Sequence, residues 1–136
     1  MKKFPGNTEL IDEYNMLCEN GFGLSKHTGL TFHHILPRCM FPEEKDNPDN
    51  WTWLSFEDHW LAHYLLWKAT DLPVYASAFW FICVYGIKNR GMTISNEDYE
   101  KLKKDVKQHQ IDVRKEREKK RYERFKQYIV DKHKTM

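Results

Sequence analysis

One stretch of this chain constrains its fold more than any other. Residues 74–85 contain no charged side chain and consist mainly of aromatic, branched aliphatic and alanine residues. Leu72-Pro73 precedes the run and Gly86 follows it, so both ends carry helix-breaking signals. A helix that is apolar on all sides is buried in a core, and this run is too short to span a bilayer. We therefore expect a buried helix over 74–85 that the rest of the chain must cover, and no membrane partner.

The size and composition of the chain indicate one folded domain. The chain is 40% hydrophobic and includes 5 Trp, 7 Tyr and 8 Phe, a composition that excludes a disordered chain. Its length of 136 residues is too short for two domains. The three cysteines lack C-x-x-C spacing, which disfavours a disulfide scaffold and a cysteine-rich zinc site. No secretory signal is recognisable at the N-terminus. We expect a single domain over 1–136 in a reducing compartment, the cytoplasm.

Periodicity and capping signals predict four helices and two strands. The expected class is α+β, mostly helical, with a long-looped hairpin that leads directly into a helix. Ser55 and Ser95 are the expected N-caps of two helices, because each is followed by acidic residues that suit a helix start. The expected segments are an N-terminal helix and turns over 1–29, strands over 30–36 and 50–54 around a loop at 38–49, a helix to residue 69, the buried helix at 74–85 and a long basic helix over 96–132.

Charge is distributed unevenly along the chain. The net charge of +2 divides into −3 for residues 1–95 and +5 for residues 96–136, and it reaches +8 from Lys101 onward. Residues 114–121 contain no apolar side chain, so a helix there projects into water or lies against a partner. A basic segment on a mildly acidic body is typical of proteins that contact a polyanion. A solvated helix with interleaved charges is the alternative.

Four of the seven histidines fall within the predicted hairpin and helix. His59 and His63 are four residues apart on a helix, a bidentate geometry for one metal ion. Neighbouring strand residues point to opposite faces, so only one of His33 and His34 can face that ion. Metal-assisted hydrolysis of a phosphodiester needs this division, because the ion stabilises charge while a separate base takes a proton from water. Imidazole suits that base because its ordinary pKa is close to neutral.

These residues resemble a known family. The string FHHILP at residues 32–37, Asn50 before a short strand and HWLAH at residues 59–63 resemble the HNH endonucleases, which have the ββα-metal fold. The resemblance is strongest to the small HNH and homing-type proteins of bacteriophages. It covers about a quarter of the chain and continues more loosely into the apolar helix.

The resemblance implies a divalent-metal-dependent DNA endonuclease with one ion held by His33, His59 and His63. The ion would bind the scissile phosphate and stabilise the leaving 3′ oxygen. His34 would be the general base, and Asn50 would brace the loop and orient that base, leaving 5′-phosphate and 3′-hydroxyl ends. Three imidazoles suit zinc, nickel or manganese, whereas the family often works with magnesium, so all four ions stay open.

A nucleic-acid substrate would give the basic residues a role. Arg38, just after the first strand, could hold a phosphate oxygen by a bidentate contact, or it could pair with an acidic residue of the loop. The long helix could instead be a homodimer arm. The residues of this helix that we expect to bind phosphates are Arg114, Lys115, Arg117, Lys119, Lys120, Arg121 and Arg124.

Two alternatives to a DNA endonuclease follow from the same residues. One is a non-catalytic nucleic-acid-binding protein that uses the histidines as a structural metal site, and the other is a nuclease that cuts RNA. Three ligands with His34 unligated indicate catalysis, whereas four ligands closed around the ion indicate a structural site. Homing, genome packaging, host-DNA degradation and defence all use this chemistry, so the motif does not select a biological role. A phage-encoded protein would act in the host cytoplasm.

Overall fold

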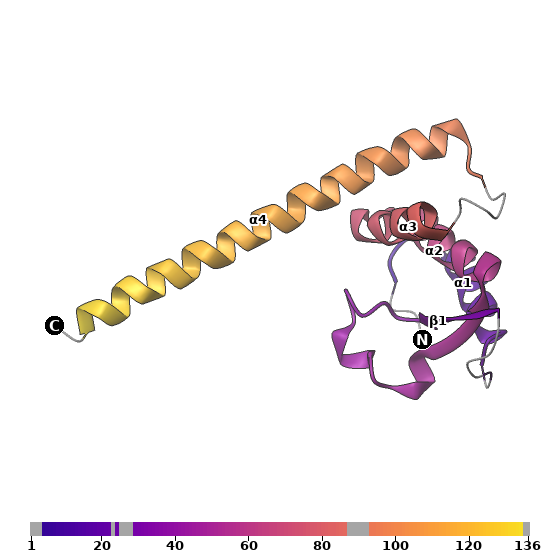
Figure 1. Cartoon of the computed structure of the whole chain (residues 1–136), viewed down its shortest axis with the longest axis horizontal. Coiled ribbons are helices and arrows are strands. Elements are labelled where there is room, and N and C mark those ends of the chain that lie inside the picture. The colour runs from indigo at the N-terminus through magenta and orange to yellow at the C-terminus, as the bar shows by residue number, and fades with distance from the viewer. Residues whose placement is uncertain (1–3, 23, 25–28, 87–92, 135–136) are drawn as a thin grey trace.

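The computed structural model describes residues 4–22, 24, 29–86 and 93–134, and its fold is mostly helical with one small sheet (Figure 1). The predicted α+β class and the predicted order of elements are confirmed. None of the described helices is both long enough and apolar enough to cross a membrane. The elements are α1 (Thr8–Glu19), β1 (Leu30–His34), β2 (Trp51–Ser55), α2 (Phe56–Thr70), α3 (Pro73–Gly86) and α4 (Asn96–Lys134), with 3₁₀ turns at Pro42–Glu44 and Pro48–Asn50.

The hairpin and α2 form one continuous unit. β1 and β2 pair antiparallel, with Leu30 opposite Ser55 and His34 opposite Trp51. β2 leads directly into α2 because Ser55 acts as the N-cap, and its Oγ accepts a hydrogen bond from the Asp58 backbone N–H at 3.2 Å. The predicted cap is therefore confirmed, and α2 follows the second strand without a linker.

Asn50 lies outside the strand in which the sequence placed it. β1 ends at His34 and Asn50 closes the second 3₁₀ turn, so the predicted strand limits at Leu36 and Asn50 are wrong. The reason is that the Asn50 side chain replaces the strand ladder. Its Oδ1 accepts from the Leu36 N–H at 2.8 Å, and its Nδ2 donates to the Leu36 carbonyl at 3.1 Å. The backbone groups of Leu36 are thus satisfied by a buried amide and not by a partner strand.

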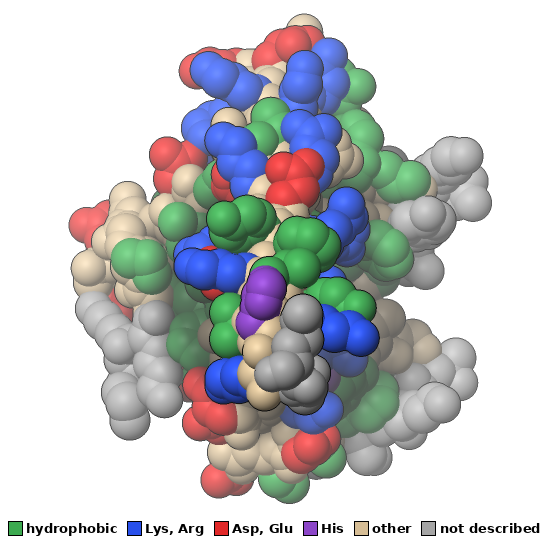
Figure 2. Space-filling model, turned by 90° about the vertical axis from the view of Figure 1, so that its left-hand side faces the viewer, with side chains coloured by type: hydrophobic (Ala, Val, Ile, Leu, Met, Phe, Trp, Pro, Cys, Tyr) green, Lys and Arg blue, Asp and Glu red, His purple; other side chains and the backbone are tan. Residues whose placement is uncertain are grey.

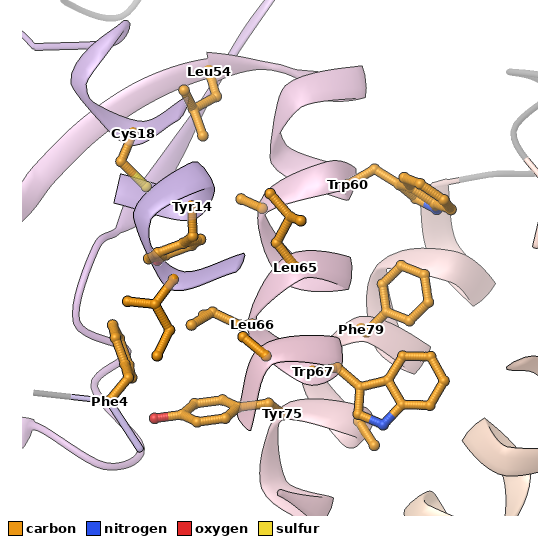
Figure 3. Close-up of a cluster of buried hydrophobic side chains, with 14 of the residues drawn as sticks. Phe4, Tyr14, Cys18, Leu54, Trp60, Leu65, Leu66, Trp67, Tyr75 and Phe79 are labelled. Atoms are coloured by element: carbon orange, nitrogen blue, oxygen red, sulfur yellow. The ribbon is translucent and has the colours of Figure 1, made fainter. Parts of the chain in front are cut away.

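The core lies between α1, α2 and α3 (Figure 3). The rings of Trp67 and Phe79 stack with centroids 5.8 Å apart. The end of α1 approaches β2 closely, because a Cβ at Gly21 would lie 2.1 Å from Thr52 Oγ1. The same threonine hydroxyl donates to the Cys18 carbonyl at 2.7 Å. These contacts fix α1 beside the hairpin, where one of its side chains reaches a histidine.

α3 is not buried on all sides, contrary to the expectation from its composition. Tyr75, Ala76 and Phe79 are buried, but Phe81 is 65% exposed and Val84 is 40% exposed. Among the described residues, α3 packs against α2 and α4. Two neighbouring helices cover two sides of a helix and leave a third side open, so part of this apolar surface faces water.

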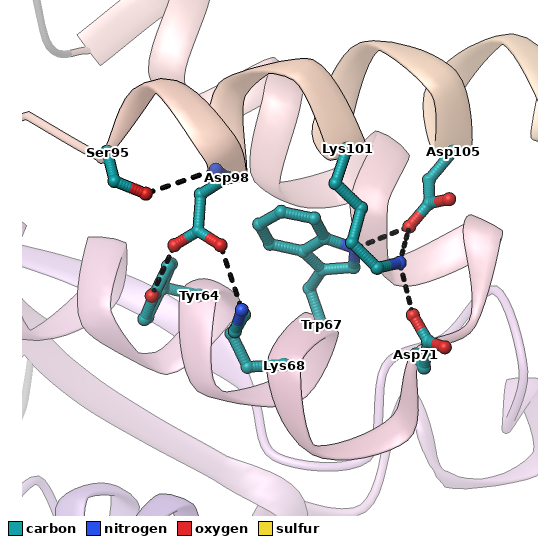
Figure 4. A network of polar contacts seen from close by, with 8 residues as sticks. All are labelled: Tyr64, Trp67, Lys68, Asp71, Ser95, Asp98, Lys101 and Asp105. Atoms are coloured by element: carbon teal, nitrogen blue, oxygen red, sulfur yellow. Dashed lines mark hydrogen bonds and ion pairs between the residues drawn. The ribbon is translucent and has the colours of Figure 1, made fainter.

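A polar network fastens the start of α4 to α2 (Figure 4). Asp98 accepts hydrogen bonds from the Tyr64 hydroxyl at 2.7 Å and from Lys68 Nζ at 2.8 Å. The bond from Lys68 is the main reason that the pKa of Asp98 is lowered. Trp67 Nε1 donates to Asp105 at 2.9 Å, and Lys101 pairs with both Asp105 and Asp71.

The remainder of α4 has few contacts with the rest of the protein. Its predicted cap is confirmed, since Ser95 Oγ accepts from the Asp98 N–H at 3.1 Å. Along its first half, Leu102 is buried, Val106 and Val113 are half-buried, and Tyr99 is 43% exposed. Every described side chain after Val113 is exposed, and the second half of the helix projects away from the other elements (Figure 1).

Candidate metal centre

Three imidazoles from β1 and α2 converge on one point. His33, His59 and His63 each offer a ring nitrogen within 4.8 Å of the others. His59 Nε2 and His63 Nε2 are 3.2 Å apart. That separation is close to the distance of about 3.3 Å between two nitrogens bound to one tetrahedral ion, given metal–nitrogen bonds of about 2.0–2.1 Å. The three side chains predicted as ligands are therefore brought together in a geometry that suits a single ion.

The Tyr14 hydroxyl determines which nitrogen of His33 is available. This hydroxyl has one proton, which it donates to the Ile35 carbonyl, and it lies 2.7 Å from His33 Nε2. Since its proton is already used, it accepts from the imidazole, and Nε2 is the protonated nitrogen of His33. Burial raises the pKa of Tyr14 well above its ordinary value, so the hydroxyl keeps its proton. His33 Nδ1 is consequently the nitrogen with a free lone pair.

Thr31 plays the same part for His59. Its hydroxyl donates to the Leu54 carbonyl at 2.9 Å and lies 2.9 Å from His59 Nδ1. The hydroxyl proton is engaged, so Nδ1 of His59 carries the ring proton and Nε2 is the acceptor. His63 Nε2 then donates to His59 Nε2 when no ion is bound. Hydrogen bonds of this kind orient metal-binding imidazoles and select their tautomer.

Burial keeps the cluster uncharged. Desolvation lowers the pKa of His59 to about 4 and that of His63 to about 3. The pKa of His33, which is only 3% exposed, is also held well below its ordinary value, first by desolvation and then by the neighbouring histidines. Neutral imidazoles have lone pairs for a cation, so the donor set fits a divalent ion at neutral pH.

His34 stands apart from the three converging imidazoles, as the strand alternation predicts. Its ring packs edge-on against Phe32, with centroids 4.8 Å apart. Its Nε2 lies 3.0 Å from the Lys45 carbonyl, which also accepts from Trp51 Nε1 at 2.9 Å. A carbonyl can only accept, so Nε2 is protonated and Nδ1 is the free acceptor in the neutral ring.

Asn50 supports the loop that holds His34. Its Nδ2 donates to the Glu44 carbonyl at 3.3 Å, one residue before the carbonyl that binds His34. The Asn50 side chain is buried, and it connects this loop to the end of β1. Asn50 therefore acts on His34 through the backbone of the loop and has no direct hydrogen bond to the imidazole.

All four histidines line one open cleft of about 280 Å³. Arg38 lies on the wall of this cleft, and its side chain is exposed. In the described part of the chain Arg38 forms no ion pair with Glu43, Glu44 or Asp46. The loop salt bridge that was the alternative for this residue is thus not made there.

The basic residues predicted on the last helix are not part of the cleft. All seven, from Arg114 to Arg124, are exposed on the projecting half of α4. Figure 2 views the molecule from the side to which α4 points, and Lys and Arg side chains lie on several sides with apolar side chains between them. Cleft and basic helix are therefore two separate candidate surfaces.

Tyr14 and Thr31 are the two site residues that the sequence did not reveal. Thr31 had a usable signal, because it lies two residues before His33 and so shares its strand face. Tyr14 lies on α1, and its contact with His33 depends on how α1 packs against β2. No local pattern in the sequence predicts that contact.

The chain is similar to curated proteins of Enterobacteria phage T4. It is 34% identical over 101 residues to the protein named "Probable mobile endonuclease B", a match that covers 71% of this chain and 36% of the relative. It is 37% identical over 76 residues to "Probable mobile endonuclease C", with 56% and 34% covered, and 33% identical over 73 residues to "Probable mobile endonuclease E", with 53% and 50% covered. The match thus spans about a third to a half of the length of these relatives. No family model and no solved structure matches the chain.

Proposed function

We propose that this chain is an endonuclease of the HNH type that depends on a divalent metal ion and hydrolyses phosphodiester bonds in DNA. One observation carries the proposal: three imidazoles converge on a point, while the adjacent His34 stays outside the cluster and opens on the same cleft. The phage T4 relatives are named as mobile endonucleases, which supports the same activity.

His33 Nδ1, His59 Nε2 and a ring nitrogen of His63 would hold the ion. A divalent ion bound there supplies Lewis-acid stabilisation of the charge that develops on the phosphate and on the leaving 3′ oxygen. Tyr14 and Thr31 keep two of the three rings in the tautomer that binding requires. His63 would use Nε2 only in the tautomer that carries the ring proton on Nδ1, so binding would couple to a tautomer change.

His34 takes the proton of the attacking water at Nδ1. The water oxygen forms a bond to phosphorus, the bond to the 3′ oxygen breaks, and that oxygen takes a proton from solvent water, so the products have 5′-phosphate and 3′-hydroxyl ends. The Lys45 carbonyl holds Nε2–H and orients the ring, and it favours the imidazolium that forms because it continues to accept a hydrogen bond. Asn50 keeps that carbonyl in place through the loop.

Two surfaces would bind the nucleic acid. Arg38 on the cleft wall would contact a phosphate beside the scissile bond. The exposed basic residues of α4 would add electrostatic affinity that does not depend on sequence. DNA is favoured over RNA by the homing-type phage proteins that the sequence resembles.

Incubation with supercoiled plasmid and with a structured RNA tests the proposal. Wild type, His34→Ala and the surface control His133→Ala would each be assayed with magnesium, manganese, zinc and nickel. We expect wild type and His133→Ala to cut DNA, and His34→Ala to be slower by about 10²- to 10⁴-fold, the usual contribution of a general base. Equal rates for wild type and His34→Ala would disprove the role of His34. Binding of DNA without cleavage by any variant would favour the non-catalytic alternative.

A further inference from the structure

An apolar groove adjoins the histidine cleft on the side of α3. Its volume is about 410 Å³, within the range of roughly 300–1,000 Å³ that is typical of ligand sites. It shares three residues with the cleft, and none of the described residues that line it is Lys, Arg, Asp or Glu. The shared residues are His59, His63 and Ala78, and the others are Thr31, Phe56, Phe81 and Ile82.

Phe81 is the distinctive residue of this groove. It lies one turn beyond Ala78 on the side of α3 that the other helices leave open, and 65% of it is exposed. An apolar groove with a largely exposed aromatic side chain and a few polar groups beside it is typical of a ligand site. The hydroxyl of Thr31 already accepts from His59 and donates to Leu54, so it offers little to a ligand. The groove therefore suits a flat, uncharged group and not a phosphate.

We infer that this groove holds the nucleobase next to the scissile phosphate, stacked on Phe81. The inference rests on the proposed function, since a phosphate at the three imidazoles would bring an adjoining nucleoside to the walls that cleft and groove share. Every base has a π face that can stack on an aromatic side chain. The Thr31 hydroxyl is already engaged with Leu54 and His59 and does not read base edges. The contact with Phe81 therefore tolerates any base.

Stacking in the groove has a consequence for the substrate. A base inside a duplex is already stacked between its neighbours, so it must leave the helix to reach Phe81. That step is easiest where the nucleotide is mismatched or unpaired. The protein should therefore prefer substrates with an unpaired nucleotide beside the cleaved bond over fully paired ones.

The test compares four variants in two assays. Wild type, Phe81→Tyr, Phe81→Leu and Phe81→Ala are compared with Val84→Ala, a control on the same helix that removes an exposed apolar side chain outside the groove. The first assay measures kcat/KM with manganese on a duplex with one unpaired nucleotide beside the mapped cleavage site and on its fully paired form. The second measures quenching of a 2-aminopurine base in a single-stranded oligonucleotide with EDTA present.

We expect wild type, Phe81→Tyr and Val84→Ala to prefer the unpaired substrate and to quench the probe. Phe81→Leu and Phe81→Ala should lose about 5- to 150-fold in kcat/KM on the unpaired substrate, the range that corresponds to one stacked base. Phe81→Leu separates stacking from bulk, because it keeps apolar volume without a ring.

The failures of the two proposals are distinguishable. Cleavage that is the same in Phe81→Ala as in wild type would overturn the inference and leave the proposed nuclease intact. Phe81-dependent quenching without cleavage by wild type would overturn the nuclease and support the groove as a base site. Absence of both cleavage and quenching would overturn both.

Discussion

Two hydroxyl groups decide which imidazole nitrogens face the centre of the cluster. Tyr14 receives the Nε2–H of His33, and Thr31 receives the Nδ1–H of His59. Both hydroxyls donate their own proton to a backbone carbonyl, so neither can donate to the imidazole. The two rings are thereby held in single tautomers, with Nδ1 of His33 and Nε2 of His59 able to accept, before any ion binds, which lowers the cost of organising the site.

Replacing Tyr14 with Phe should weaken metal binding. The Nε2–H of His33 and the Ile35 carbonyl both lose a buried partner, which we expect to cost about 1–3 kcal/mol of stability. The affinity for zinc should fall by about 10- to 100-fold, the usual effect of removing such a partner. Titration calorimetry measures the affinity, with Tyr75→Phe as a control that removes another buried tyrosine hydroxyl. Unchanged zinc affinity in Tyr14→Phe would contradict this role.

The metal-free protein should lose stability in mild acid. His59 and His63 have pKa values of about 4 and about 3 when folded, below the ordinary value near 6.5. The unfolded chain therefore takes up protons first as the pH falls, so the stabilisation is complete above about pH 6.5 and is lost toward pH 3. Urea unfolding in EDTA at pH 7.5 and pH 5 measures this loss. His63→Gln should show a smaller decrease than wild type, and an equal decrease would refute the assignment.

At the scale of elements, the loop between β1 and β2 is positioned by one side chain. Asn50 Nδ2 donates to the carbonyls of Leu36 and Glu44, and the next carbonyl, of Lys45, holds His34. The long loop is therefore a support for His34, although its sequence resembles an ordinary turn-rich connection.

Asn50→Asp should test this support with almost no change in shape. The carboxylate cannot donate to either carbonyl, so the loop should shift and the cleavage rate should fall by about hundredfold. Asn7→Asp serves as the matched control, because Asn7 caps α1 through its Oδ1 and Asp is an equally good cap. A full rate in Asn50→Asp would show that His34 needs no such support.

The projecting half of α4 should account for part of the salt dependence of DNA binding. Truncation after Val113 removes ten Lys and Arg residues, so the slope of log K against log salt should decrease by about 0.9 for each phosphate that these residues neutralise. Zinc binding should not change, because all three imidazoles lie outside the deleted segment. Tyr122→Ser/Phe125→Ser/Ile129→Ser keeps every charge but removes exposed apolar groups. Weakened DNA binding in that variant, with an unchanged salt slope, would favour a dimer arm.

For the whole molecule, capping residues and periodicity in the sequence predicted the helices and strands. The contacts between these elements and the exposure of their side chains depend on long-range packing. Ser55 and Ser95 capped the helices as expected, and His59 and His63 shared a helix face. The contact between Tyr14 and His33 joins residues 19 positions apart on two different elements, so no local pattern predicts it. The exposure of Phe81 depends on how many helices are present to cover α3, which hydropathy alone does not reveal.

Positive and negative charge are divided between two parts of the molecule. The mildly acidic part of the chain contains the histidine cleft, and the second half of the basic α4 forms an arm that projects away from the other elements (Figure 1). In the proposed nuclease, the bound ion and Arg38 supply positive charge at the cleft, and α4 supplies affinity at a distance from it. This arrangement predicts that the affinity for DNA falls strongly with salt, whereas the rate of the cleavage step changes much less.

We propose that three histidines hold one ion and that His34 stays free to act as a base. The most direct test is metal stoichiometry, measured by titrating the EDTA-treated protein with zinc, alongside cleavage by the same preparations. We predict that His34→Ala binds one ion per chain as tightly as wild type yet cuts DNA about 10²- to 10⁴-fold more slowly, whereas His63→Ala neither binds the ion tightly nor cuts. Loss of the ion in His34→Ala, or cleavage at the wild-type rate by that variant, would contradict the role proposed for His34.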